Sequence, residues 1–263
     1  MSLELLPGHE GEMLWWFRTG GLALRAAMTT RDGGVSKAPY DSLNLGFHVD
    51  DDAIAVDQNR RLALEAFSSG IEQLVTVQQV HGADVATVDG SDAGTGAVGR
   101  FDAMVTNDPS VVLGILAADC VPIIAYDPIA QVLGVAHAGW RGLRAGVAGA
   151  TVRAMARIGA QPRRIVAGLG PSISPDRYEV GGEVVEGLEA SLLATPPGAV
   201  RLGGQRPHVD LAAFAAAQLV EAGVPRDVVA VPEVGTGRPG PFFSDREQRP
   251  CGRFALLAGL LAS

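Results

Sequence analysis

The segment from Val121 to Ala136 reads VPIIAYDPIAQVLGVA, in which a short turn separates two apolar runs. The runs, Val121 to Tyr126 and Val132 to Ala136, have the length and composition of buried strands. Between them, Asp127 precedes Pro128, whose ring fixes φ as a tight turn requires. So short a connection predicts an antiparallel hairpin, which argues against a purely parallel sheet.

Comparable apolar segments occur along the chain, interleaved with segments rich in helix-forming residues. Further strands are expected at 22–28, 74–80, 111–116, 165–169 and 228–231, and helices at 52–67, 143–158, 182–194, 210–222 and 251–262. Asp210 stands at an N-cap position, Pro250 precedes the last of these helices, and Gly159 and Gly223 follow two others as stops. The irregular order predicts an α+β fold whose sheets are covered by helices. Because no repeat or long linker divides the sequence, we expect one domain spanning residues 1–263.

Charge and apolar patterning exclude several classes of protein. The 263 residues include 29 acidic and 21 basic side chains, and the formal net charge of −8 argues against a nucleic-acid partner. No apolar stretch approaches the about 20 residues that cross a bilayer, so no membrane partner is expected. Residues 1–12 show no basic start followed by an apolar run, so no secretory signal is predicted.

Cysteine and histidine are scarce, which limits the metal chemistry available to the chain. The two cysteines, Cys120 and Cys251, cannot form a disulfide framework and fit a reducing cytoplasm. Five histidines are too few for an enzyme with several copper centres. The sequence therefore allows one small metal site at most.

Three expected strand ends carry one soft metal ligand each, namely His81, Cys120 and His137. They lie too far apart in sequence for a zinc finger, so the fold must assemble the site. Two imidazoles and one thiolate match a catalytic zinc, whose fourth position stays open for water or substrate. A blue-copper site uses the same ligands with an axial partner, and none of the five methionines lies in the loop that would supply it. Zinc is therefore favoured, with copper as the alternative.

Simpler interpretations of these residues remain open. His137 begins HAGWRG (137–142), where two glycines, a helix start and the charge of Arg141 favour an anion such as phosphate. An ordinary strand-to-helix turn around a buried histidine explains the same pattern. Cys120 is also typical of a buried apolar residue, since its neighbour Asp119 would not lower the pKa of the thiol.

Several motifs, read together and in order, resemble one protein family. They are TRDGGVS (30–36), YDSLNLG (40–46), HVDD (48–51), NR (59–60), QVHG (79–82), ADC (118–120), HAGWRG (137–142), LGP (169–171) and YEVG (178–181). The sequence is similar to the YfiH family of laccase-domain-containing proteins, which was first labelled multicopper polyphenol oxidase. The resemblance covers nearly the whole chain.

The resemblance implies a single α+β domain with α/β/β/α layers and a zinc ion held by His81, Cys120 and His137, which act in catalysis through the metal. It implies a purine nucleoside phosphorylase, in which adenosine, inosine, guanosine or 5′-methylthioadenosine reacts with phosphate to give the free base and ribose 1-phosphate. Adenosine deaminase activity is expected as a side reaction, and the chain is expected to be a monomer or a weak homo-oligomer.

Three other functions stay open. The older family label keeps a copper-dependent polyphenol oxidase as the first alternative. A cysteine hydrolase, with Cys120 as nucleophile and His137 as base, is the second. The third is a binding module in which the zinc is structural.

Four residues in the matching motifs are expected to bind substrate: Asn44, Arg60, Gln79 and Arg141. His48 is a secondary candidate, although the aspartates after it could simply cap the following helix. The first three also have structural interpretations, which are the less favoured ones: Asn44 could stabilise a turn, Arg60 could be a solvated helix residue and Gln79 could project from a strand edge.

The C-terminal part departs from the family pattern of a Cys-Thr pair, an aromatic-Ser-Tyr-Arg-Arg run and a Thr-Gly-Arg sequence. The chain has VGT (234–236), FFSDRE (242–247) and CGR (251–253). Asp245 and Glu247 replace the tyrosine and the second arginine, so an anion contact made by that run is in doubt, although Arg246 and Arg253 remain. Cys251 is expected to lie at the start of the last helix.

Overall fold

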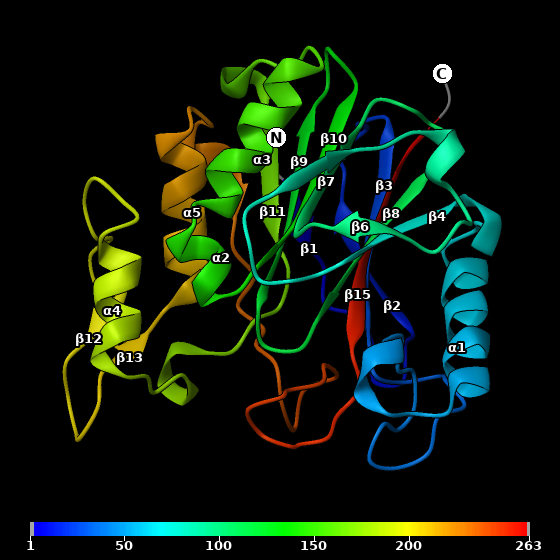
Figure 1. The fold of residues 1–263 in the computed structure, drawn as a ribbon, viewed down its shortest axis with the longest axis horizontal. Coiled ribbons are helices and arrows are strands. Elements are labelled where there is room, and N and C mark those ends of the chain that lie inside the picture. Colours follow the sequence, from blue (N-terminus) through cyan, green and yellow to red (C-terminus); the bar gives the residue numbers. More distant parts are fainter. Residues whose placement is uncertain (1–2, 262–263) are drawn as a thin grey trace.

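Two mixed β-sheets lie face to face in the computed structural model, which describes residues 3–261 (Figure 1). The first sheet has the strand order β1 (Glu4–Leu5), β2 (Leu14–Arg18), β3 (Leu24–Thr29), β15 (Phe254–Leu260), β8 (Val112–Ala117), β4 (Leu74–Gln78) and β6 (Ala97–Arg100). The second has the order β14 (Val229–Ala230), β11 (Val166–Leu169), β9 (Val121–Asp127), β10 (Val132–Ala138), β7 (Ala103–Thr106) and β5 (Val85–Thr87). A short ribbon pairs β12 (Val200–Arg201) with β13 (His208–Val209).

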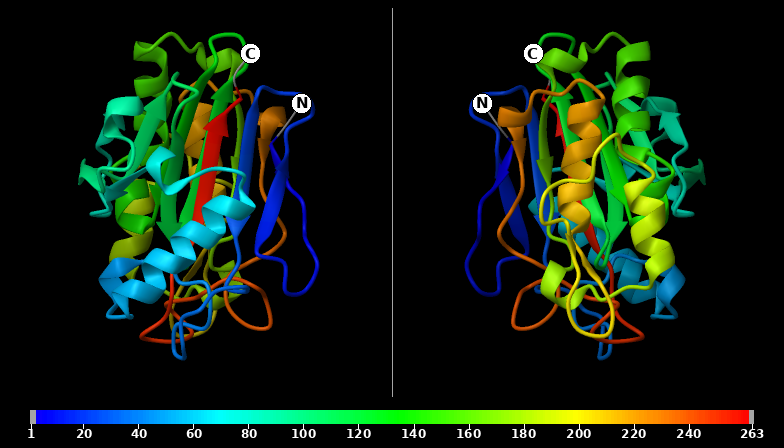
Figure 2. Two further views of the ribbon diagram at one scale, coloured as in Figure 1. Left: turned by 90° about the vertical axis from the view of Figure 1, so that its right-hand side faces the viewer. Right: turned by 90° about the vertical axis from the view of Figure 1, so that its left-hand side faces the viewer.

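Helices cover the outer faces of both sheets (Figures 1 and 2). Helix α1 (Ala53–Ala66) packs on the first sheet through a cluster that includes Leu64, Val112 and Leu257. On the second sheet lie α3 (Val147–Arg157) and α5 (Leu211–Glu221), and α2 (Trp140–Arg144) and α4 (Gly182–Glu189) extend that layer. The predicted α+β class, with its α/β/β/α layers, is confirmed.

The core between the sheets explains why the central strands are so apolar. Leu113 and Leu256 of the first sheet belong to one buried cluster with Ile124 and Val135 of the second. Strands β9, β10 and β15 are buried at every residue. Strands covered on both faces have continuous apolar sequences rather than an alternating pattern.

The predicted hairpin is confirmed as β9 and β10, which pair antiparallel from Asp127↔Val132 to Val121↔Ala138. The Asp127 carboxylate accepts the backbone N–H groups of Ile129, Ala130 and Gln161, and it pairs with Arg164. The turn is therefore fixed by a buried carboxylate as well as by the proline.

The predicted helix at 251–262 is wrong, because Phe254–Leu260 forms β15 in the middle of the first sheet. Its leucines and alanines favour a helix locally, but pairing with β3 and β8 and burial on both faces decide the conformation. Pro250 and Cys251 therefore precede a strand, and Ala262 lies outside the described residues.

Other boundaries were predicted with mixed success. The helix expected at 143–158 is two helices, α2 and α3, separated at Gly146, where φ is 81°. Helix α4 ends at Glu189, earlier than expected. The predicted caps are confirmed, since Asp210 accepts the N–H of Ala213 and both Gly159 and Gly223 have positive φ after their helices.

Several strands were not predicted, namely β1, β2, β5, β6, β7, β12 and β13. Across residues 3–261, no helix has the length and apolarity needed to span a bilayer.

The central position of β15 leads to a stability prediction. Leu256 is fully buried between the sheets, so Leu256→Ala should lower the free energy of unfolding by about 2–5 kcal/mol in urea titrations. Leu193 is 94% exposed, so Leu193→Ala should change the free energy of unfolding by less than about 0.5 kcal/mol. Equal effects of the two substitutions would contradict the placement of β15.

Candidate metal centre

The strand topology brings three chain segments to one edge of the sandwich. Strands β4 and β8 are parallel, so their C-terminal ends lie at the same edge. Residues 118–120 then carry the chain from β8 in the first sheet to β9 in the second. Strand β10 runs back along β9 and ends opposite its first residue. The segments that carry His81, Cys120 and His137 therefore meet where the two sheets join.

The three predicted ligands are brought together. The ligand atoms of His81, Cys120 and His137 all lie within 4.8 Å of one another, and the two imidazole rings are 4.9 Å apart in an edge-on arrangement. His81 is exposed, Cys120 is half-buried and His137 is 4% exposed. Over residues 3–261, this is the one group of histidine, cysteine or acidic side chains with such convergent geometry. Zinc bonds to sulfur and nitrogen are about 2.0–2.3 Å long, so two ligand atoms of one ion lie at most about 4.6 Å apart. A slight closing of the cluster would therefore let the three atoms share one ion.

The backbone around the site adopts conformations that few residues tolerate. His81 has φ of 59° and Asp119 has φ of 87°, both in the left-handed region. Gly139 approaches so closely that a Cβ there would lie 2.7 Å from Cys120 Sγ and 3.3 Å from His81 Cδ2. Glycine is therefore required at this position if the thiol and the imidazole are to keep their places.

A buried carboxylate, Asp102, lies behind the cluster and was not identified from the sequence. It accepts the backbone N–H groups of Val80, His81 and Gly82, and its Oδ1 lies 2.9 Å from His137 Nδ1. A metal-binding histidine almost always has such an acceptor on its other nitrogen. Asp102 stands directly before the apolar sequence AMV (103–105), which is typical of a buried strand. An aspartate in that position could have been identified from the sequence as a candidate partner of a metal-binding histidine.

The electrostatics of the cluster favour a thiolate. Burial alone would raise the pKa of Cys120, but the charge and hydrogen bonds of His137 and His81 outweigh it and lower the pKa from 9.0 to about 6. Burial would likewise lower the pKa of His137, yet Cys120 and Asp102 raise it from 6.5 to about 9. Asp119, the sequence neighbour considered above, is not among the groups that lower the Cys120 pKa, and the two histidines that lower it are distant in sequence. A thiolate and imidazoles are the ligands that zinc prefers.

Two of the predicted substrate-binding residues are engaged inside the protein. Asn44 is buried, donates to Asp51 and accepts the N–H groups of Gly46 and Arg253. Gln79 uses both ends of its amide on the backbone of Leu116, as acceptor and donor, at 2.8 and 2.7 Å. The contacts support the structural roles that the sequence left open for both.

The guanidinium groups of Arg60 and Arg141 are not paired with carboxylates of residues 3–261. Arg60 donates through Nε to the Leu45 carbonyl, and its guanidinium lies 4.5 Å from the centre of the Phe47 ring. Burial lowers its pKa to about 10. Arg141 is exposed and stacks 4.4 Å from the Trp140 ring.

His48 is exposed beside this region. Its pKa is lowered mainly by partial burial, and to a smaller extent by the charges of Arg253, Arg60 and the two site histidines. His48 therefore lies within electrostatic range of the cluster. The capping role considered for the neighbouring aspartates also exists, because Asp52 accepts the N–H of Ile54 at the start of α1.

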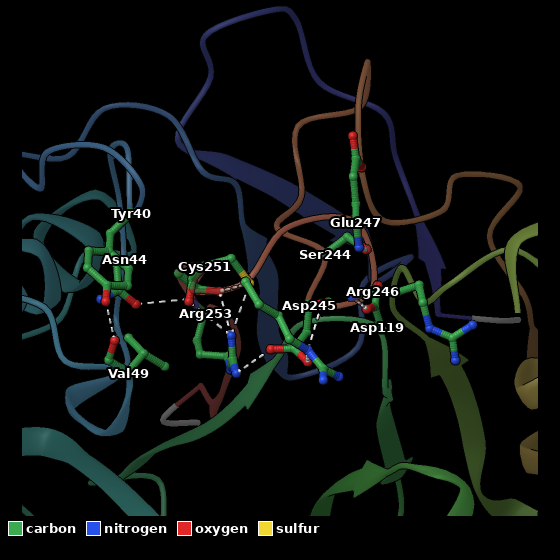
Figure 3. Close-up of polar contacts among 12 residues, drawn as sticks. Tyr40, Asn44, Val49, Asp119, Ser244, Asp245, Arg246, Glu247, Cys251 and Arg253 are labelled. Carbon is green, nitrogen blue, oxygen red and sulfur yellow. Dashed lines mark hydrogen bonds and ion pairs between the residues drawn. The ribbon is translucent and has the colours of Figure 1, made fainter.

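Tyr178 and Asp119 connect the cluster to the C-terminal segment. Burial and the Cys120 charge raise the pKa of Tyr178 to about 12, and the Arg246 guanidinium stacks 5.0 Å from its ring. Asp119 accepts the Thr236 hydroxyl and the backbone N–H of Arg246. The segment is thus attached at Asp119, the residue that precedes Cys120 in the sequence (Figure 3).

The two acidic departures from the family pattern neutralise arginines. Asp245 pairs with Arg253 at 3.0 Å and with Arg249 at 2.7 Å, as Figure 3 shows for Arg253. Glu247 pairs with Arg177 at 3.1 Å. Arg253 also donates to the carbonyls of residues 251 and 252, and Arg246 to those of residues 177 and 179. The arginines that remain from the family run are therefore occupied within the protein.

Comparisons with known proteins agree with this architecture. A family model described as multi-copper polyphenol oxidoreductase laccase matches residues 25–261. Purine nucleoside phosphorylase SCO2081 of Streptomyces coelicolor is 44% identical over 86% of this chain and 91% of its own length. Purine nucleoside phosphorylase YfiH of Escherichia coli is 37% identical over 94% and 97%. The crystal structure of YlmD from Geobacillus stearothermophilus superposes with a TM-score of 0.91 at 36% identity, covering 99% of this chain and 100% of that one.

The lowered pKa of Cys120 predicts the pH dependence of its alkylation in metal-free protein. The thiolate fraction should rise through pH about 6, so the rate constant for iodoacetamide should level off by pH about 7.5. Burial raises the pKa of Cys251, so Cys120→Ser should abolish the fast reaction. A midpoint near the ordinary thiol pKa of about 8.5 would contradict the pairing of Cys120 with His137.

Proposed function

The chain belongs to the multi-copper polyphenol oxidoreductase laccase family, and we propose that it acts as a zinc-dependent purine nucleoside phosphorylase. The observation that carries the proposal is the convergence of His81, Cys120 and His137 in a chain whose relatives are named purine nucleoside phosphorylases. The proposed substrates are adenosine, inosine, guanosine or 5′-methylthioadenosine, together with phosphate. The proposed unit is one domain, residues 1–263, acting in the cytoplasm as a monomer or weak homo-oligomer.

In this proposal, the three side chains hold zinc, with Cys120 as thiolate and both histidines neutral. A bound zinc would supply a Lewis acid that polarises an oxygen of phosphate or water. In phosphorolysis a phosphate oxygen forms a bond to the anomeric carbon of the ribose while the bond from that carbon to the purine nitrogen breaks. The purine takes up a proton as it leaves.

Phosphate must be attracted by local groups, because the net charge of −8 opposes its approach. Arg60, Arg141 and Arg246 form no ion pair with the carboxylates of residues 3–261, whereas Arg253 pairs with Asp245. Arg246 donates to the carbonyls of Arg177 and Glu179 and stacks on Tyr178. We therefore assign anion binding to Arg60 and Arg141. Asn44 and Gln79 remain proposed substrate contacts that would need to exchange their present partners.

Adenosine deamination is proposed as a side reaction of the same site. It requires water activated at an open metal position and attack on the purine ring carbon that bears the amino group. The chain lacks the His-x-Glu and Pro-Cys-x-x-Cys motifs of cytidine-type deaminases, so the reaction would use a different arrangement.

A second candidate function, a cysteine hydrolase, is favoured by one specific contact. Asp102 orients His137 as the third member of a Cys-His-Asp triad orients its imidazole. The same Cys120 cannot be both a zinc ligand and a free nucleophile, so metal loading separates the two functions. The copper-dependent polyphenol oxidase remains as a single-copper alternative, because one convergent ligand group in residues 3–261 does not make a multicopper centre.

Incubation with the four nucleosides, with and without phosphate, tests the proposal. Chromatography should show free base and ribose 1-phosphate only when phosphate is present, and Cys120→Ser should lower the rate at least about 100-fold by removing a metal ligand. Cys251→Ser should keep the activity, because Cys251 is buried away from the ligand cluster. The proposal fails if no nucleoside releases its base, or if release is independent of phosphate.

A further inference from the structure

Asp102 occupies a position where three chain segments meet. It lies directly before β7, its carbonyl accepts the N–H of His137 at 2.7 Å, and its N–H donates to the carbonyl of Asp84 at 3.1 Å. Its side chain is fully buried, and its oxygens lie within hydrogen-bond distance of the backbone N–H groups of residues 80–82 and of His137 Nδ1. A buried carboxylate is retained only where hydrogen bonds compensate for the loss of water.

The contact with His137 selects a tautomer of the imidazole. An ionised carboxylate only accepts hydrogen bonds, so His137 Nδ1, 2.9 Å from Asp102 Oδ1, must be the donor. The Asp102 carboxylate also accepts three backbone N–H groups, which are the contacts of an ionised acceptor. In neutral His137 the lone pair then resides on Nε2, the nitrogen that remains available to the ligand cluster.

The contacts with the backbone fix the other histidine. Three consecutive N–H groups, those of Val80, His81 and Gly82, point at the same carboxylate at 3.1, 3.0 and 2.6 Å. This turn holds His81 at φ 59°, a conformation that needs support from its surroundings. One carboxylate therefore holds the imidazole of His137, at the end of β10, and the backbone of His81, in the loop after β4.

We propose that Asp102 is a positioning residue that prearranges both histidine ligands, so that the cluster binds a metal ion without changing the tautomer of His137 or the turn at His81. The inference rests on the proposed metal-binding role of His81, Cys120 and His137, and concerns the affinity of the site. Without this carboxylate, His137 would sample both tautomers and His81 would leave its strained turn. Each change would have to be reversed when metal binds.

Asp127 offers a matched control. It is also fully buried, and it also accepts three backbone N–H groups and one side-chain donor. It lies on the same sheet, at the opposite end of the β9–β10 hairpin from the ligand cluster. A merely structural role of Asp102 would make Asp102→Asn and Asp127→Asn equivalent.

The test compares zinc dissociation constants, measured by competition with a chromophoric chelator, for wild type and both variants. Asp102→Asn should weaken zinc binding about 10–100-fold, and Asp127→Asn should leave it within twofold of wild type. Unfolding of the metal-free proteins is measured in parallel and should show destabilisation in both variants. The inference is overturned if Asp102→Asn binds zinc within twofold of wild type, or if both variants weaken it equally. A wild type that binds no zinc would overturn the proposed function itself.

A second measurement needs no variant and covers the case in which Asp102→Asn does not fold. In a crystal structure of zinc-loaded wild type, the ion should bond to His137 Nε2 while Nδ1 keeps its contact with Asp102. An ion bonded to His137 Nδ1, with Asp102 turned away, would overturn the inference.

Discussion

The burial of two mixed sheets against each other is the constraint on which the candidate site depends. The parallel pairing of β4 with β8 and the antiparallel pairing of β9 with β10 determine where the ends of these strands lie. The C-terminal ends of β4, β8 and β10 must lie at one edge, and the crossing between the sheets must pass between them. Each segment contributes one soft ligand at that edge. The site is thus a property of topology, and no single segment contains it.

Electrostatics at this edge are local and largely compensated. A chain with net charge −8 holds a thiolate because two imidazoles lie beside it, and the buried Asp102 favours the charged form of one of them, His137. The acidic residues that depart from the family pattern, Asp245 and Glu247, are paired with Arg253 and Arg177. Arg60 and Arg141, which we assign to anion binding, form no ion pair with the carboxylates of residues 3–261.

Local signals predicted what depends on local structure. The hairpin followed from apolar runs around an Asp-Pro turn, and the three ligands followed from their places at strand ends. Strand β15 was missed because leucine and alanine favour a helix until neighbours on both sides impose a strand. Asp102 was missed because its partners come from segments at 80–82 and at 137, which only the fold brings together. Asn44 and Gln79 were assigned from motifs, but their hydrogen bonds to Arg253 and Leu116 depend on tertiary pairing.

Metal content tests the central claim most directly, because it asks whether the convergent cluster is a zinc site in the protein itself. Wild-type protein purified without added metal should contain one zinc per chain by mass spectrometry. Cys120→Ser should lose that zinc, and Cys251→Ser should retain it. Zinc that persists without Cys120, or several copper ions per chain in the wild type, would contradict the account.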